Sequence, residues 1–240
     1  VYPGKNGRAF GRGRSLRGAL PPAPHKSMAT LTDPTEIGGL LRNIDAYGGE
    51  YTTRAALQLA PMLMLRPNEL RQGRWSEIDL DAAEWRIPVE RMKARQTIKD
   101  ARAGEVAHIV PLPQQAVEIL RQLQPLTGDG DLVFPGIHKT RPLSEQTMLF
   151  ALRRIGYTGE EQTVHGFRAM ASTLLHELGF DSDLIEKQLA HADPNKIRAR
   201  YNHADRLADR RKMLQAWADY LDQLRAGNGD KVVPIRSAGA

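Results

Sequence analysis

The spacing of apolar residues changes twice along this chain, and these changes limit the folds open to it. Residues 53–64 carry apolar side chains at helical intervals. Between Trp75 and Leu112 the apolar residues fall instead in three short segments bounded by Asp, Pro and Gly, a pattern typical of strands. Helical spacing returns after Pro113. The sequence therefore predicts an α+β fold that is mainly α, with a small three-stranded antiparallel sheet at its edge.

The expected helices begin at recognisable signals. Asp33, Pro34 and Glu36 supply an N-cap, a first-turn proline and an acid three residues after the cap, so a helix is expected from here to about Tyr47. Residues 66–70 are expected to form a bend, and residues 132–135 a short extended piece. The other expected helices cover residues 53–64, a segment from 113 to about 123, and residues 144–155, 166–178, 183–190, 194–201 and 205–224.

Length and composition favour one globular domain with tails. A chain of 240 residues with 41% hydrophobic content can fill one core. We expect a basic flexible tail or linker at 1–30, one folded domain at 31–226 and a flexible tail at 227–240. The absence of cysteine excludes disulfides and thiolate chemistry and fits a reducing cytoplasm. The longest apolar stretch, residues 59–65, is too short to cross a membrane.

The positive charge of the chain is concentrated at one end. Residues 1–30 hold six of the 34 Lys and Arg residues and no acid, which leaves 28 basic against 28 acidic residues in the rest. The body is therefore formally neutral. The net charge of +6 does not by itself establish nucleic-acid binding, because a solvated linker has the same composition.

Residues able to act on a phosphate gather in the second half. Residues 163–168 predict a helix start that places His165 and Arg168 three positions apart, where free backbone N–H groups favour an anion. His191 and Tyr201 follow, and Arg66 precedes them in an R-x-x-E-L setting that includes Glu69. Each of these residues taken alone is more often structural: Arg66 in an ion pair with Glu69, His191 as a helix cap, Tyr201 as a packing residue.

In their order these residues resemble the tyrosine recombinase family, also called the phage integrases. The resemblance spans residues 28–224 and is strongest to prophage integrases, through W-x-I-P-x-x-R-M-K at 85–93, V-P-L at 110–112, H-G-F-R at 165–168, L-A-H at 189–191 and W-A-D-Y-L at 217–221. It implies site-specific integration or recombination of double-stranded DNA by transesterification, in which Tyr201 forms a 3′-phosphotyrosyl link and releases a 5′-hydroxyl. Ala190 stands where the wider family commonly has Gly.

The resemblance implies that residues 31–226 are the catalytic domain and that residues 1–30 are a tail or linker from a missing core-binding domain. It also assigns roles to single residues. Arg66 and Arg168 would clamp the non-bridging phosphate oxygens bidentately, and Glu69 would brace the site. His165 is the candidate proton acceptor for Tyr201, and His191 would donate a hydrogen bond to the phosphate. A lysine would protonate the leaving 5′ oxygen. Lys93 matches the family's position, with Lys99 in the longer segment that follows as the alternative.

The same resemblance implies neither metal nor nucleotide. The spacings of His165, His176, His191 and His203 match no familiar zinc pattern. The expected partners are DNA attachment sites and further copies of the chain in a tetramer, in a bacterial cytoplasm and with no membrane. The apolar stripe around Trp217 packs either on its own domain or on a neighbour. Two alternatives stay open: a DNA-binding relic of a truncated integrase that no longer recombines DNA, and a type IB topoisomerase.

Overall fold

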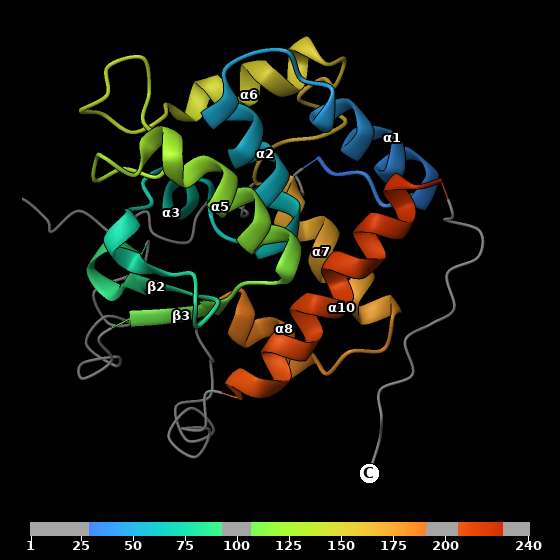
Figure 1. Cartoon of the computed structure of the whole chain (residues 1–240). Coiled ribbons are helices and arrows are strands. Elements are labelled where there is room, and N and C mark those ends of the chain that lie inside the picture. The colour runs from blue at the N-terminus through green and yellow to red at the C-terminus, as the bar shows by residue number, and fades with distance from the viewer. Residues whose placement is uncertain (1–28, 93–106, 191–205, 228–240) are drawn as a thin grey trace, which may run out of the picture.

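The computed structural model of the chain describes residues 29–92, 107–190 and 206–227. It is mostly helical, with one three-stranded sheet at the edge of the helical body (Figure 1), so the predicted α+β fold is confirmed. The elements in chain order are α1 (Pro34–Asp45), α2 (Tyr51–Leu63), α3 (Pro67–Arg71), the 3-10 turn η1 (Trp75–Glu77), β1 (Ile78–Asp79), β2 (Glu84–Pro88), the 3-10 turn η2 (Val89–Arg91), β3 (Ala107–Pro111), α5 (Gln114–Thr127), α6 (Glu145–Arg154), α7 (Gly166–Glu177), α8 (Ser182–Gln188) and α10 (Leu207–Arg225).

Helix α2 runs through the middle of the helical body and packs against α1, α5, α6, α7 and α10 (Figure 1). Its residues from Ala55 to Leu63 are buried almost without interruption. A helix that is apolar on all sides is stable only inside a core, which explains its central place. Pro61 sits inside this helix, and its carbonyl oxygen accepts a hydrogen bond from Trp217 Nε1 at 2.8 Å.

The apolar stripe of α10 packs on its own domain. Helix α10 lies along α1 and also contacts α2, β3 and α8 (Figure 1). Trp217 and Leu221 are completely buried, and Leu224 is almost so. Of the two possibilities that the sequence left open for this stripe, the structure has the one within the chain.

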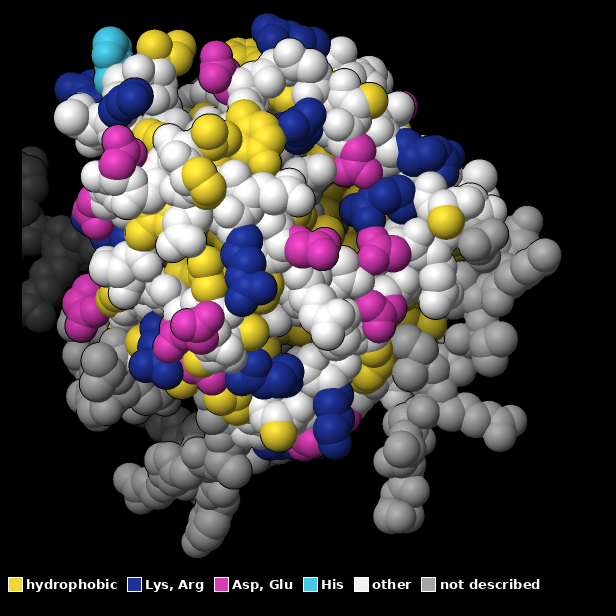
Figure 2. All heavy atoms as spheres, in the orientation of Figure 1, with side chains coloured by type: hydrophobic (Ala, Val, Ile, Leu, Met, Phe, Trp, Pro, Cys, Tyr) yellow, Lys and Arg dark blue, Asp and Glu magenta, His cyan; other side chains and the backbone are white. Residues whose placement is uncertain are grey.

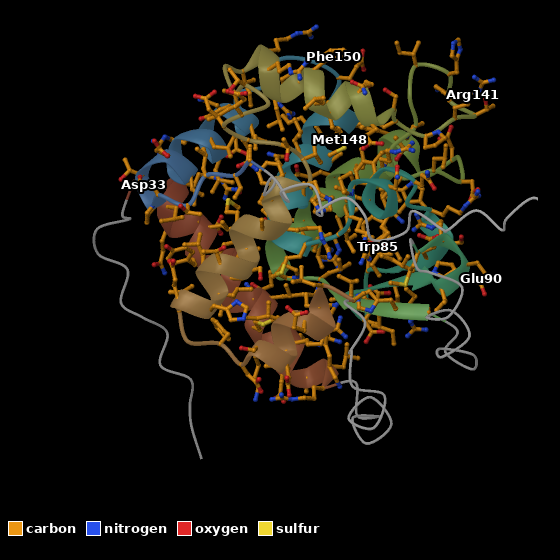
Figure 3. All side chains as sticks on the ribbon, turned by 180° about the vertical axis from the view of Figure 1, so that it is seen from behind. Asp33, Trp85, Glu90, Arg141, Met148 and Phe150 are labelled. Atoms are coloured by element: carbon orange, nitrogen blue, oxygen red, sulfur yellow. The ribbon has the colours of Figure 1, made fainter. Side chains whose placement is uncertain are left out.

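The sheet has the order β1-β2-β3 with both pairs antiparallel, as predicted. Trp85 on β2 pairs with Val110 on β3, and its side chain is fully buried between the sheet and the helices (Figure 3). The prediction was wrong at Trp75, which lies in η1 and not in a strand. Its indole Nε1 donates to the Thr127 hydroxyl at 3.2 Å, so tertiary packing overrides its strand propensity.

The predicted bend at residues 66–70 is instead the short helix α3. Pro67 occupies its first position, and the Glu69 side chain accepts from the Arg66 backbone N–H at 3.0 Å. These are the signals that correctly predicted the start of α1, where Asp33 caps the helix and Pro34 is its first residue. A proline at the first position and an acid at the third favour a helix start in both places.

The surface facing the viewer in Figure 2 mixes acidic and basic side chains and has no large patch of one sign. This agrees with the formally neutral body. Among the described residues, no helix is both long and apolar enough to span a membrane. On α6, Met148 is buried whereas Phe150 is largely exposed (Figure 3).

Candidate active site

The candidate site lies at the C-terminal end of α2, where two side chains from distant elements bind the last carbonyl groups of the helix. Gln188 at the end of α8 donates to the Leu63 carbonyl oxygen at 3.1 Å, and Arg168 on α7 donates to that of Met64. Met64 adopts a left-handed conformation with φ of 56°, which ends the helix and turns the chain toward Arg66. A helix leaves its last carbonyls without internal partners, and here side chains satisfy them.

Arg66 is the N-cap of α3 and is paired with Glu69. Its Nη1 lies 2.8 Å from Glu69 Oε1, and the Glu69 side chain is 3% exposed. Arg91, which follows β2, donates to the Glu69 backbone carbonyl at 2.9 Å and binds Glu77 at 2.6 Å. The ion pair considered as the alternative role of Arg66 therefore exists. The Arg66 side chain keeps 19% of its surface exposed, so the ion pair does not remove it from contact with solvent.

Arg168 is buried, with 6% of its surface exposed. Its Nη2 donates to the Leu189 carbonyl oxygen at 2.8 Å, so the guanidinium joins the end of α8 to the end of α2. Burial, and after it the positive charge of Arg66, lowers the pKa of Arg168 to about 10, while Glu69 and Glu186 oppose this lowering. The Met64 carbonyl that accepts from Arg168 lies two residues before Arg66, so the two arginines, 102 positions apart in the sequence, lie near each other.

His165 is the N-cap residue of α7, directly before the first helical residue. Its side chain is exposed, whereas Arg168 three residues later is buried. The two side chains, three positions apart, therefore differ in their exposure to solvent. The helix begins where the sequence predicts it.

The segment before α1 passes across the start of α7. The Leu31 backbone N–H donates to Gln162 Oε1 at 2.9 Å, and the Thr30 hydroxyl donates to the Gly166 carbonyl at 2.9 Å. Gly166 has no room for a side chain, because a Cβ there would lie 2.3 Å from the Ala29 carbonyl oxygen. These contacts fix the N-terminal end of the helix that carries Arg168.

Four other predicted site residues, Lys93, Lys99, His191 and Tyr201, lie outside the described residues, as do His203 and the helix expected at 194–201. The described chain next to them ends at Met92 and Ala190 and resumes at Arg206. Ala190 has a φ of 49°, in the left-handed region that favours glycine. This conformation gives a physical reason for the glycine that the wider family commonly has before the histidine. Among the described residues, no group of three or more side chains is arranged to hold a metal ion.

Two residues at the site were not singled out from the sequence, namely Gln188 and Arg210. Gln188 is 1% exposed and follows Leu184 and Ile185 at helical spacing; Arg210 is fully buried on α10. A polar residue at a core position of an amphipathic helix was the available signal, since Arg210 lies on the apolar stripe that includes Leu207 and Leu214. Such a residue needs a partner inside the fold.

Comparison with known proteins identifies the family of the chain. Residues 31–207 match the family model described as the phage integrase family. The chain therefore belongs to the phage integrase family, the family of the tyrosine recombinases.

Sequence relatives support the assignment. The chain is 44% identical over 191 residues to the integrase of Enterobacteria phage P4, which covers 77% of this chain and 44% of that protein. It is 36% identical over 206 residues to the prophage integrase IntA of Escherichia coli (strain K12), covering 85% of this chain and 47% of IntA. The chain thus spans less than half the length of these relatives.

Two solved structures share the fold. The integrase from mycobacterium phage Brujita superposes with a TM-score of 0.57 at 18% identity, over 85% of this chain and 65% of that one. XerH site-specific recombinase, solved bound to its difH substrate in a pre-cleavage complex, superposes with a TM-score of 0.51 at 20% identity, over 78% of this chain and 55% of that one.

Proposed function

We propose that this chain carries the catalytic part of a site-specific DNA recombinase. Tyr201 attacks a phosphodiester of double-stranded DNA and forms a 3′-phosphotyrosyl link, and the released 5′-hydroxyl then attacks the corresponding link in a partner duplex. The energy of the broken bond is kept in the link, so the exchange requires neither metal nor nucleotide. Residues 31–226 form the catalytic domain, and residues 1–30 connect it to the DNA-binding part that the longer relatives have room for.

The observation that carries this proposal is the convergence of Arg66 and Arg168. Arg168 is buried, whereas the Arg66 side chain beside it keeps 19% of its surface exposed. Two neighbouring guanidinium groups raise each other's free energy, and the charge of Arg66 contributes, after burial, to the lowered pKa of Arg168. A phosphate between or beside them relieves this repulsion. Since a phosphodiester under attack gains charge on its non-bridging oxygens, the same pair stabilises the transition state more than the ground state.

The remaining roles follow the family motifs. His165 accepts the proton of Tyr201, whose hydroxyl is a poor nucleophile at neutral pH without a base or nearby cations. His191 donates a hydrogen bond to the phosphate. Lys93, with Lys99 as the alternative, protonates the leaving oxygen. Glu69 holds Arg66 through the ion pair at 2.8 Å. The assembly that exchanges strands is a tetramer on paired attachment sites, in the cytoplasm of a bacterium.

A covalent trapping experiment tests the proposal. The full chain is incubated with a pool of labelled duplexes that carry a nick in a randomised sequence, so that a short fragment diffuses away after cleavage and the enzyme stays linked to DNA. We expect a labelled protein–DNA adduct that survives SDS with wild type and is absent with Tyr201→Phe.

Tyr220→Phe is the matched control, because Tyr220 is a buried residue of α10 with no proposed role in the reaction. This variant should form the adduct as wild type does. A wild-type chain that forms no adduct, or a Tyr201→Phe chain that forms as much as wild type, would falsify the proposal. A lysine that acts on the leaving oxygen becomes dispensable when a 5′-bridging sulfur replaces that oxygen, so this substrate identifies Lys93 or Lys99 through rescue of the corresponding alanine variant.

A further inference from the structure

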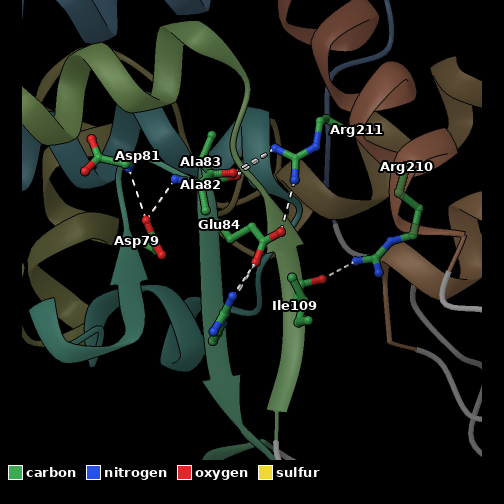
Figure 4. A network of polar contacts seen from close by, with 9 residues as sticks. Asp79, Asp81, Ala82, Ala83, Glu84, Ile109, Arg210 and Arg211 are labelled. Carbon is green, nitrogen blue, oxygen red and sulfur yellow. Dashed lines mark hydrogen bonds and ion pairs between the residues drawn. The ribbon is translucent and has the colours of Figure 1, made fainter.

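Arg210 is a completely buried arginine in the first turns of α10 (Figure 4). Its Nε and Nη2 donate to Gln188 Oε1 at 3.1 and 2.8 Å, and its Nη2 also donates to the Ile109 carbonyl oxygen at 2.6 Å. One side chain thus connects α10, α8 and β3. An arginine removed from water in this way requires such partners, because an uncompensated buried charge is strongly destabilising.

The partner Gln188 connects Arg210 to the candidate site. While its Oε1 accepts from Arg210, its Nε2 donates to the Leu63 carbonyl oxygen at 3.1 Å. The next residue in each chain segment binds Arg168: the Met64 and Leu189 carbonyl oxygens both accept from its guanidinium. The same two peptide segments, 63–64 and 188–189, are therefore held twice. Arg168 binds both directly, whereas Arg210 binds Gln188 and reaches residue 63 through it.

The position of this network in the sequence gives it a second consequence. Gln188 lies three residues before His191, Arg210 nine residues after Tyr201, and Ile109 in the strand that follows the segment with Lys93 and Lys99. The Arg210 guanidinium therefore joins the three described elements that are adjacent in sequence to the other candidate site residues.

We propose that Arg210, acting through Gln188, is a positioning residue for the strand-cutting reaction. This inference rests on the proposed function. In this role Arg210 acts through Gln188 and not on the phosphate itself. It fixes the ends of α8 and α2, and these ends orient the Arg168 guanidinium. A planar guanidinium suits this role, since it donates to two acceptors in fixed directions, which a lysine does not.

Arg210→Met tests the proposal, and Arg211→Met is its matched control. Arg211 is the next residue of α10 and also joins the helix to the sheet, since it donates to the Ala82 carbonyl at 3.0 Å and to Glu84 Oε1 at 3.0 Å (Figure 4). Both contacts go to the sheet side of the helix, at the β1–β2 turn and the start of β2. Because displacing a catalytic group by about 1 Å slows a reaction roughly a hundredfold, we expect Arg210→Met to slow adduct formation by about tenfold to a hundredfold. Arg211→Met should leave the rate unchanged.

A second variant separates positioning from folding. Gln188→Glu retains a partner for Arg210 but cannot donate to the Leu63 carbonyl oxygen when ionised. It should slow adduct formation while its melting temperature stays near that of wild type. If Arg210→Met does not fold, this variant alone decides the question, and a wild-type rate in it overturns the proposal.

Two further readouts respond to position and not to stability. In a double-mutant cycle below the melting temperature, Arg210→Met should slow wild type but add little to Arg168→Met, because its effect passes through Arg168. In the ¹⁵N spectrum of the arginine Nε groups, the Arg168 signal, identified by its loss in Arg168→Met, should shift in Arg210→Met and stay in place in Arg211→Met.

The outcomes distinguish the two proposals. If wild type forms adduct and Arg210→Met and Gln188→Glu form it equally fast, the inference about Arg210 is overturned and the proposed function stands. If wild type forms no adduct, the proposed function is overturned and the catalytic role of Arg210 with it. Additive rates in the double-mutant cycle, or an Arg168 signal that does not move, also overturn the inference.

Discussion

The middle and the C-terminal end of α2 are stabilised in opposite ways. In the middle, fully buried apolar residues such as Leu57 and Leu59 contact the surrounding helices, and the interactions have no strict direction. At the end, buried polar groups from α7 and α8 bind backbone carbonyls, and the chain leaves the helix through Met64 with a positive φ. The helical frame is therefore stabilised by burial of apolar side chains. The site is stabilised by directional hydrogen bonds, which have to offset the cost of burying the charge of Arg168.

The largest effect on stability is expected in the apolar region. Trp217→Ala should lower the free energy of unfolding by about 3–5 kcal/mol, because it leaves a cavity between α10 and α2 and removes the bond from Nε1 to the Pro61 carbonyl. Chemical denaturation measures this. The control Phe150→Ala removes an aromatic ring that is 55% exposed and should change stability by less than about 0.5 kcal/mol. Equal losses in both variants would contradict the comparison.

The next effect concerns the reaction rate. Arg168→Met should raise the barrier to adduct formation by about 3–4 kcal/mol, or roughly a hundredfold to a thousandfold in rate, because a clamp on the developing phosphate charge is lost. Single-turnover trapping at saturating enzyme measures it. The control Arg153→Met changes a basic residue in the last turn of α6, outside the site, and should leave the rate unchanged. A fast Arg168→Met chain would mean that this buried guanidinium serves only the fold.

A smaller effect tests how closely the helices of the frame approach. A Cβ at Gly38 on α1 would lie 2.3 Å from the Leu224 backbone oxygen on α10. Gly38→Ala should therefore cost about 1–3 kcal/mol of unfolding free energy through overpacking. The next residue is a matched control: at Gly39 the nearest atom is the Tyr157 hydroxyl at 3.9 Å. Gly39→Ala should be neutral or gain up to about 1 kcal/mol, and a gain at both positions would show that α1 and α10 can separate.

Relief of backbone strain is expected to be smaller still. Ala190→Gly should raise the free energy of unfolding by about 1 kcal/mol, because Ala190 has a φ of 49° that glycine adopts without strain. Ala83, with a φ of 52° in the turn between β1 and β2, is the control outside the site. Ala83→Gly should gain a similar amount. Thermal denaturation compares the two, and a loss at Ala190 alone would show that the site requires the alanine.

The last prediction concerns the pKa of Arg168. Arg66→Met should raise this pKa from about 10, although burial, the larger cause of the lowering, remains. The lowered pKa also makes stability depend on pH. The charge of Arg168 reduces the free energy of unfolding at pH values below about 10, and this reduction is lost as the pH rises above about 10. A ¹⁵N titration of Arg168 measures the change. An unaltered pKa would show that Arg66 does not act on this group.

Local signals in the sequence were sufficient for most elements of the fold. The cap at Asp33 and the proline after it predicted α1, and the change of apolar spacing predicted the sheet. The same kind of signal was present at Arg66 and Pro67 but was interpreted as a bend, because a helix of one turn shows no apolar period. The strand prediction at Trp75 failed for another reason, because its hydrogen bond to Thr127 joins residues that are far apart in the sequence.

The sequence by itself determined the family of the chain and the order of its candidate groups, because motifs such as H-G-F-R are contiguous and survive without a fold. Only the tertiary structure decided that α10 packs on its own domain, that Arg66 lies near the buried Arg168, and that Arg210 reaches Gln188. The physical reason is that desolvation and charge interactions depend on distances in space. Residues 66 and 168 become neighbours in space only when the ends of α2, α7 and α8 meet.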